Sequence, residues 1–227
     1  MKSKEWLGFL LFMGNALFRM FATLNPIGAI PTFLSITVRE SLDKKLMTAR
    51  RSAIAAAVVL TVFTLIGDTI FNLFSISIGT FRMAGGLLLL LTAVDMVRAK
   101  PSPIRSTLEE QEESAQKDDV AIVPLGIPIL AGPGSIATAL ILSVPMKGSV
   151  SELTLFGSSR MARSICIVLV SLMACFLSWL VFRYAAKAER YLSKTMLRVL
   201  ERAMGLLLTA IAMQFLIDGF RAVFYGG

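Results

Sequence analysis

The sequence predicts an all-α, polytopic membrane protein with six transmembrane helices, arranged as an inverted 3+3 repeat in which helices 1 and 4 are discontinuous. The 227-residue chain is 56% hydrophobic and 17% charged, whereas soluble domains carry roughly a quarter charged residues. Six apolar runs reach the length of about 20 residues that a helix needs to cross a bilayer. Two of these runs are interrupted by prolines and glycines in similar places.

The six apolar runs leave little sequence for a separate soluble domain. The first is overlong, because about 32 residues of straight helix would measure nearly 50 Å, against a hydrocarbon core of about 30 Å. It must therefore bend, break or re-enter. The runs cover approximately Trp6–Thr37, Ser52–Phe74, Ile76–Val97, Ala121–Val144, Ser164–Tyr184 and Val199–Gly219.

A polar segment divides the chain into two halves. Residues 99–119 contain six acidic residues, three basic residues and no aromatic residue, a composition typical of a flexible linker. We therefore predict a first three-helix repeat at 1–98, an acidic cytoplasmic linker at 99–120 and a second, inverted three-helix repeat at 121–227. A regulatory docking segment is the alternative for the linker.

Lysine and arginine are concentrated on one predicted side of the membrane. The loops that join helices 1–2, 3–4 and 5–6, with their helix ends, hold 15 of the 23 basic residues. The positive-inside rule places these loops in the cytoplasm and both termini in the periplasm or outside the cell. The net charge of +8 thus reflects orientation, and we expect no nucleic-acid partner.

The two halves resemble each other. "PIGAIP" at Pro26–Pro31 parallels "PLGIP" at Pro124–Pro128, and "RMAGGLLLLLTAVDM" at Arg82–Met96 parallels "RAMGLLLTAIAMQF" at Arg202–Phe215. Because each half holds an odd number of predicted spans, the second half must be inverted relative to the first. This arrangement is common in secondary transporters.

The prolines and glycines of runs 1 and 4 predict helix breaks. Proline removes a backbone donor and clashes with the preceding turn, and an unpaired backbone group in lipid costs several kcal/mol. Broken backbone therefore persists where it faces protein or a watery cavity. A simple proline kink is the alternative for one break, but two breaks in matched positions indicate a binding site.

The predicted breaks offer uncharged polar groups and helix N-termini. N–H groups at a helix start suit an anion such as a carboxylate. We expect free donors on Gly28, Ala29 and Ile30 after the first break, and on Gly134, Ser135 and Ile136 after the second, with Ser135 also able to act as a cap. The nearby polar side chains, none of them charged, are Asn25, Thr32, Ser135 and Thr138. This composition favours a small zwitterion.

Four segments together resemble the MarC family of bacterial and archaeal inner-membrane proteins. They are "NPIGAIPTFLSIT", "GDTIFNLFSISIGTFRMAGGLLLL", "VPLGIPILAGPGSIAT" and "ERAMGLLLTAIAMQFLIDGF". The resemblance implies six helices, two of them broken, and transport of small neutral amino acids such as glycine and alanine across the bacterial inner (plasma) membrane. The positions that match the family's motifs are Asn25, Pro26, Gly28, Gly132, Pro133, Gly134 and Ser135.

Two further polar residues in the spans are candidates for coupling to a H⁺ or Na⁺ ion, since such residues are costly in lipid. The first is Asp68, for which the alternatives are an interfacial acid or a partner for Arg82. The second is Gln214, for which the alternative is a hydrogen bond to a neighbouring helix. Arg19 is expected to snorkel outward, with contact to a substrate carboxylate as the alternative. The predicted substrate-binding set is Asn25, Pro26, Gly28, Ala29, Thr32, Gly132, Gly134, Ser135 and Thr138.

The absence of histidine from the sequence argues against metal sites and proton relays that use this residue. Cys166 and Cys175 are expected to be packing residues. We therefore expect no metal, no cofactor and no enzymatic activity. The predicted function is secondary transport of a small neutral amino acid by alternating access. The alternative is a channel or an exporter for another small solute, and a homo-oligomer remains open.

Overall fold

The computed structural model describes residues 2–98, 121–143 and 160–225, so the predicted acidic linker at 99–120 lies outside the described residues. The described ranges are helical apart from short turns. The elements are α1 (Lys2–Leu24), α2 (Pro26–Ile36), α3 (Leu42–Leu73), α4 (Ile78–Val97), the π-helix η1 (Ala121–Leu130), α6 (Pro133–Ser143), α7 (Arg160–Ala188), the short 3-10 helix η3 (Glu189–Tyr191) and α8 (Lys194–Phe224).

Within these ranges, five helical segments are long and apolar enough to cross a membrane. The predicted fourth run consists instead of two shorter pieces, η1 and α6, of 10 and 11 residues. The prediction of a polytopic helical membrane protein is confirmed, and both runs predicted to be discontinuous are interrupted. The five segments are Trp6–Ile36, Leu42–Gly67, Ile78–Val97, Ala162–Tyr191 and Thr195–Phe224.

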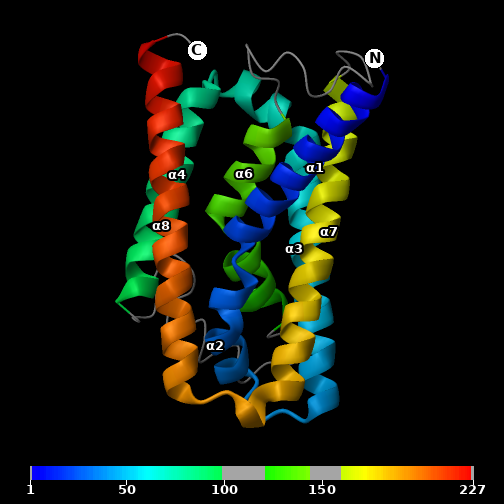
Figure 1. The fold of residues 1–227 in the computed structure, drawn as a ribbon, viewed down its shortest axis with the longest axis vertical. Coiled ribbons are helices and arrows are strands. Elements are labelled where there is room, and N and C mark those ends of the chain that lie inside the picture. The colour runs from blue at the N-terminus through cyan, green and yellow to red at the C-terminus, as the bar shows by residue number, and fades with distance from the viewer. Residues whose placement is uncertain (1, 99–120, 144–159, 226–227) are drawn as a thin grey trace.

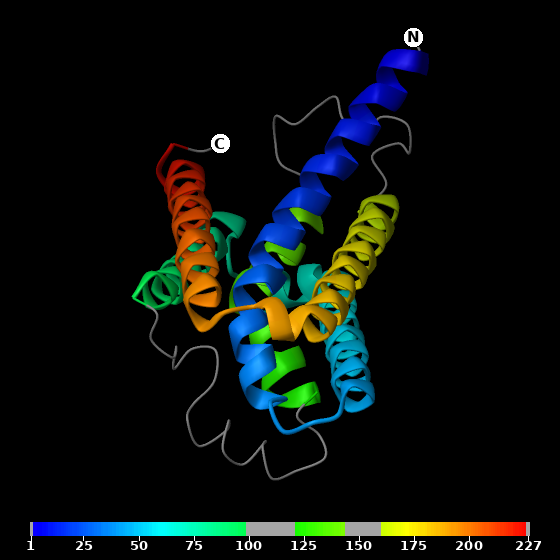
Figure 2. The same cartoon turned by 60° about the horizontal axis from the view of Figure 1, so that its bottom comes forward.

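Two helix pairs flank the interrupted segments. The helices α4 and α8 pack along each other, as do α3 and α7, and α1, α2, η1 and α6 lie between the two pairs (Figure 1; Figure 2). Both chain termini lie at one end of the bundle, which we call the terminus end. The opposite end, where α2 ends and α3 and α8 begin, is the loop end.

Glycines bring α4 and α8 into close contact. A Cβ atom added at Gly86 would lie 3.0 Å from the backbone oxygen of Ala212, and one at Gly219 would lie 2.8 Å from the carbonyl oxygen of Gly79. Small residues of this kind let membrane helices associate by backbone packing, since burial of apolar surface provides little driving force in lipid. The α4–α8 pair is therefore packed backbone against backbone.

Buried hydroxyl groups are satisfied inside their own helices. Ser52 donates to the carbonyl of Thr48 at 2.7 Å, and Ser178 donates to that of Ala174 at 2.8 Å. Such bonds remove the cost of placing a hydroxyl in an apolar environment. Many large apolar side chains, including Leu11, Phe18 and Leu169, are more than half exposed on the outside of the bundle, where a bilayer would cover them.

Gly219→Leu is expected to destabilise the protein, because its side chain would push against the backbone of α4. Overpacking of this kind costs about 1–3 kcal/mol, which lowers Tm by about 2–4 °C for each kcal/mol in a chain of this size. Thermal unfolding of the purified protein measures the effect. Gly14→Leu is the control, because a Cβ atom at Gly14 meets nothing within 4 Å. Equal Tm values for the two variants would contradict the close packing of α4 and α8.

Candidate functional site

A single residue, Asn25, forms the first break. It is fully buried and adopts a left-handed backbone conformation, with φ 47° and ψ 52°. Its N–H donates to the carbonyl of Phe21 at 3.0 Å, and its own carbonyl accepts from the N–H of Ala29 at 3.2 Å. Its side-chain Oδ1 accepts from the N–H of Gly28 at 3.2 Å. Asn25 thus ends α1 and caps α2, which starts at Pro26.

The first break differs from the sequence-based expectation in two ways. The prediction that the N–H groups of Gly28 and Ala29 are free is wrong, because Asn25 occupies both donors. The prolines do not form the break themselves. Pro26 is the first residue of α2, where a missing donor costs nothing, and Pro31 is accommodated inside that helix.

The second break lies between η1 and α6, at Ala131 and Gly132. The N–H of Ile136 donates to the carbonyl of Gly132 at 3.0 Å, which starts the hydrogen-bond ladder of α6. The Ser135 hydroxyl lies 2.6 Å from the carbonyl oxygen of Leu130 and 3.0 Å from that of Gly132, and donates toward them. The prediction that Ser135 caps N–H groups is therefore wrong. The first-turn N–H groups of Gly134 and Ser135 have no intrahelical acceptor.

The two breaks correspond at positions that differ from the predicted repeat. Asn25–Pro26 at the start of α2 matches Gly132–Pro133 at the start of α6. Pro124, which the sequence comparison paired with Pro26, lies inside η1. The useful signal is a residue that tolerates unusual dihedrals followed by proline at the first helical position.

Both breaks pack against one face of α4. The side chain of Met96 lies against Gly28 and accepts a hydrogen bond from Asn25 Nδ2 at 3.2 Å, and the side chain of Leu89 lies against Gly134. Seven residues of helix separate Met96 from Leu89, so the breaks lie roughly 10 Å apart along α4. Sequence analysis missed both residues, since nothing distinguishes them from the other apolar residues of their run.

The structure buries most of the predicted substrate-binding set between the two helix pairs. Thr32 and Gly132 are half-buried, and the Thr138 hydroxyl donates to the carbonyl of Gly134 at 2.9 Å. The buried members are Asn25, Pro26, Gly28, Ala29, Gly134, Ser135 and Thr138.

Of the two coupling candidates, Gln214 lies away from the breaks, and the side chain of Asp68 is not described. Gln214 is exposed on α8 and donates to Asp218 Oδ1 on the same helix at 2.8 Å. The prediction that it bonds a neighbouring helix is therefore wrong, and its exposed position does not support a coupling role at the breaks. Asp68 falls in α3, and its side chain lies outside the described residues. Arg19 is exposed on α1, and its snorkelling stays a prediction.

Two grooves on the outside of the bundle do not suit a zwitterion. One, of about 460 Å³, lies against α7 beside the first break and is lined by apolar side chains including Phe21, Ile30 and Val181. Another, of about 290 Å³, lies between α3 and α7 and is also largely apolar. In the described ranges, no group of three or more Cys, Asp or Glu residues could hold a metal ion.

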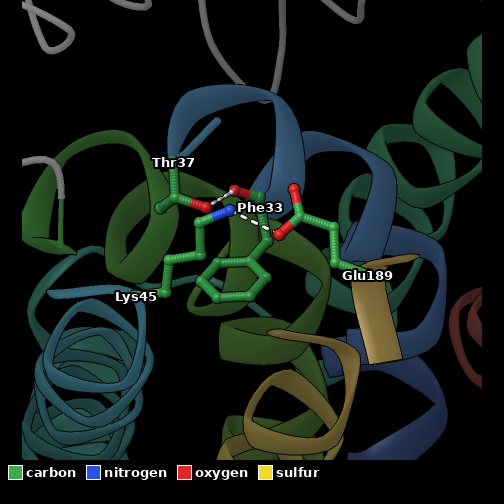
Figure 3. Close-up of polar contacts among 4 residues, drawn as sticks. All are labelled: Phe33, Thr37, Lys45 and Glu189. Carbon is green, nitrogen blue, oxygen red and sulfur yellow. Dashed lines mark hydrogen bonds and ion pairs between the residues drawn. The ribbon is translucent and has the colours of Figure 1, made fainter. Parts of the chain in front are cut away.

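An ion pair closes the loop end beside α2. Lys45 of α3 is only 5% exposed, and its Nζ lies 2.5 Å from Glu189 Oε2. Figure 3 shows the two side chains pointing toward each other next to Phe33 and Thr37. Phe33 stacks on Phe182 of α7 with ring centroids 4.9 Å apart, and Thr37 donates to the carbonyl of Phe33 at 2.8 Å. These contacts join the two halves of the chain at this end.

Asn25→Gly is expected to be more stable than Asn25→Ala by about 1 kcal/mol. Both variants lose the same side-chain hydrogen bonds, but only glycine adopts the left-handed conformation without steric cost. The order is the reverse of that in an ordinary helix interior, where alanine is favoured by about 1 kcal/mol. Thermal unfolding of both variants decides the matter. A more stable alanine variant would show that the backbone at Asn25 is not left-handed.

Glu189→Gln is expected to lower the stability by about 1–2 kcal/mol, because it leaves the buried Lys45 ammonium unpaired. The figure is below the 3–5 kcal/mol of a fully buried pair, since the Glu189 side chain is 37% exposed. Lys45→Met combined with Glu189→Gln should restore part of the loss. Asp43→Asn, an equal charge change at an exposed site, is the control. Strictly additive effects of the two substitutions would argue against the pairing.

Comparisons with known proteins agree on one family. A model described as "MarC family integral membrane protein" matches residues 10–224. The UPF0056 membrane protein YhcE of Escherichia coli is 34% identical, over 91% of each chain. The UPF0056 membrane protein YvbG of Bacillus subtilis is 33% identical, over 94% of this chain and 96% of its own. No solved structure matches significantly. The chain belongs to the MarC family of integral membrane proteins.

Proposed function

We propose that this protein is a secondary transporter of small neutral amino acids, such as glycine and alanine, which works by alternating access around the two helix breaks. One observation carries the proposal: two interrupted segments lie buried side by side and contact the same face of α4 through Gly28 and Gly134. Buried helix ends of this kind form substrate sites in transporters, because they present backbone groups where lipid cannot reach.

The pattern of contacts supports two inverted halves. Helix α3 packs against η1 and α6, and its proposed counterpart α7 packs against α1 and α2. Helix α4 packs against α6, and its proposed counterpart α8 packs against α2. Each of these contacts thus has an equivalent when the halves are exchanged. This reciprocity is what six spans in a 3+3 inverted repeat would produce, with α1–α2 and η1–α6 as the two discontinuous members.

The two breaks favour opposite charges of a zwitterion. The second break offers the N–H groups of Gly134 and Ser135 at the positive end of the α6 dipole, which suits a carboxylate. At the first break, Asn25 already occupies the N–H groups of Gly28 and Ala29, so the carbonyl end of α1 is the better partner for an ammonium group. Both glycines pack tightly on α4, which disfavours a large ligand.

The proposal includes an orientation and a coupling ion. Both termini lie at the same end of the bundle (Figure 1), and the basic loop end would face the cytoplasm of a bacterial cell by the positive-inside rule. Movement of a neutral substrate against its gradient would need a coupled ion, H⁺ or Na⁺. Asp68 remains the candidate residue for that coupling, and the protein is proposed to have no enzymatic activity.

Glycine or alanine at millimolar concentration is expected to raise the Tm of the purified protein. Ligand at 100 times its Kd stabilises the folded state by about 2.7 kcal/mol. Gly134→Val combined with Leu89→Ala moves side-chain volume from α4 into the second break, and should abolish the response. Leu89→Ala alone is the matched control and should keep it.

A transport assay in liposomes separates a carrier from a channel. Saturable uptake and counterflow of labelled glycine or alanine are expected for the wild type and not for the double variant. A flux that rises linearly with concentration and shows no counterflow would favour a channel. Absence of both binding and flux for every neutral amino acid would refute the proposed substrate class.

A further inference from the structure

Arg82 is a buried cation for which the described residues show no ion-pair partner. Its side chain is 6% exposed, and its Nε is buried with no hydrogen-bond partner. Within the described residues, Lys45 forms an ion pair with Glu189, whereas Arg82 forms no ion pair. A buried charge that lacks a counter-charge is strongly destabilising, and ionisable residues inside a membrane segment are functional by default.

Arg82 lies on the face of α4 that contacts α6. Gly85, one turn away, packs against Ala137, since a Cβ atom there would lie 2.6 Å from the Cβ of Ala137. Leu89, a further turn on, contacts Gly134 at the second break. Residues three and seven positions apart share one helix face. Arg82 is therefore about 10 Å from the level of the second break, toward the terminus end.

Among the described residues, the charges that act on Arg82 come from α8 and α1. Asp218 of α8 attracts Arg82, whereas Arg19 of α1 repels it. The Asp218 carboxylate accepts a hydrogen bond from Gln214 and forms no ion pair with Arg82. Three elements thus contribute two cations and one acid. This balance favours a small anion, and Asp218 supplies the one acid among these groups.

We propose that Arg82 binds the carboxylate of a small ligand at the terminus end of the α4–α6 interface, at a site separate from the two breaks. A guanidinium group presents several N–H donors in a planar fork that matches a carboxylate. A zwitterion bound there would place its ammonium group toward Asp218. The identity of that ligand as an amino acid rests on the proposed function, but the carboxylate site itself does not.

The test compares wild type, Arg82→Gln and Arg82→Lys by thermal unfolding of the purified full-length protein. Sodium acetate near ten times its Kd should raise the Tm of the wild type by about 3–6 °C, relative to sodium chloride at the same ionic strength. The shift should vanish in Arg82→Gln and shrink in Arg82→Lys, which keeps the charge and loses the fork. Arg98→Gln, at the opposite end of α4, is the matched control and should respond as the wild type does.

Stability without ligand gives an independent readout. Arg82→Gln should have a Tm equal to or above that of the wild type, because the substitution removes a buried charge and breaks no ion pair. A large fall in Tm that Asp68→Asn reverses would show a structural ion pair and overturn the proposal. An acetate shift that persists in Arg82→Gln, or an equal shift with chloride, would also overturn it.

The same variants separate this site from the proposed function. If glycine stabilises the wild type and Arg82→Gln equally, the transporter proposal stands and the carboxylate site falls. If acetate gives a shift that depends on Arg82 but no amino acid does, the carboxylate site stands and the proposed substrate class falls. Glycinamide, which lacks the carboxylate, should give no shift that depends on Arg82.

Discussion

An unpaired backbone group inside a bilayer costs several kcal/mol, and this constraint governs how the chain is built at its centre. At the first break, Asn25 satisfies the backbone through its own N–H, carbonyl and side chain. At the second break, the Ser135 hydroxyl donates to the carbonyls of Leu130 and Gly132. The interrupted segments can exist because local side chains and neighbouring helices replace the water that lipid excludes.

Helix α4 connects the main features of the molecule. Its side chains Leu89 and Met96 hold the two breaks, and its glycines bring its backbone against α8. Because the α4–α8 pair is packed backbone to backbone, conformational change is easier to accommodate in the central segments than between these two helices. The two buried cations lie toward opposite ends of the bundle. Lys45 is paired with Glu189 at the loop end, whereas Arg82 near the terminus end has no ion-pair partner among the described residues.

The sequence by itself determined the class of protein and the approximate spans, because an apolar run of helical length has one stable environment, the bilayer. It also identified the two interrupted runs and nearly all the residues around them. It placed the predicted repeat at "PIGAIP" and "PLGIP", whereas the equivalent helix starts are Pro26 and Pro133. A proline pattern shows that a helix is disturbed nearby, but does not show whether proline starts the helix, as Pro26 does, or lies within it, as Pro31 does.

Tertiary structure decided which donors and charges are available. The sequence predicted free N–H donors on both Gly28 and Gly134, and it named Arg82 as an alternative partner for Asp68. Packing engaged the N–H of Gly28 with Asn25 and, among the described residues, left the Nε of Arg82 buried without a hydrogen-bond partner. It also set Gln214 on the exposed face of α8 rather than toward the breaks. These outcomes depend on contacts between residues far apart in the chain, such as Asn25 with Met96, which local periodicity does not encode.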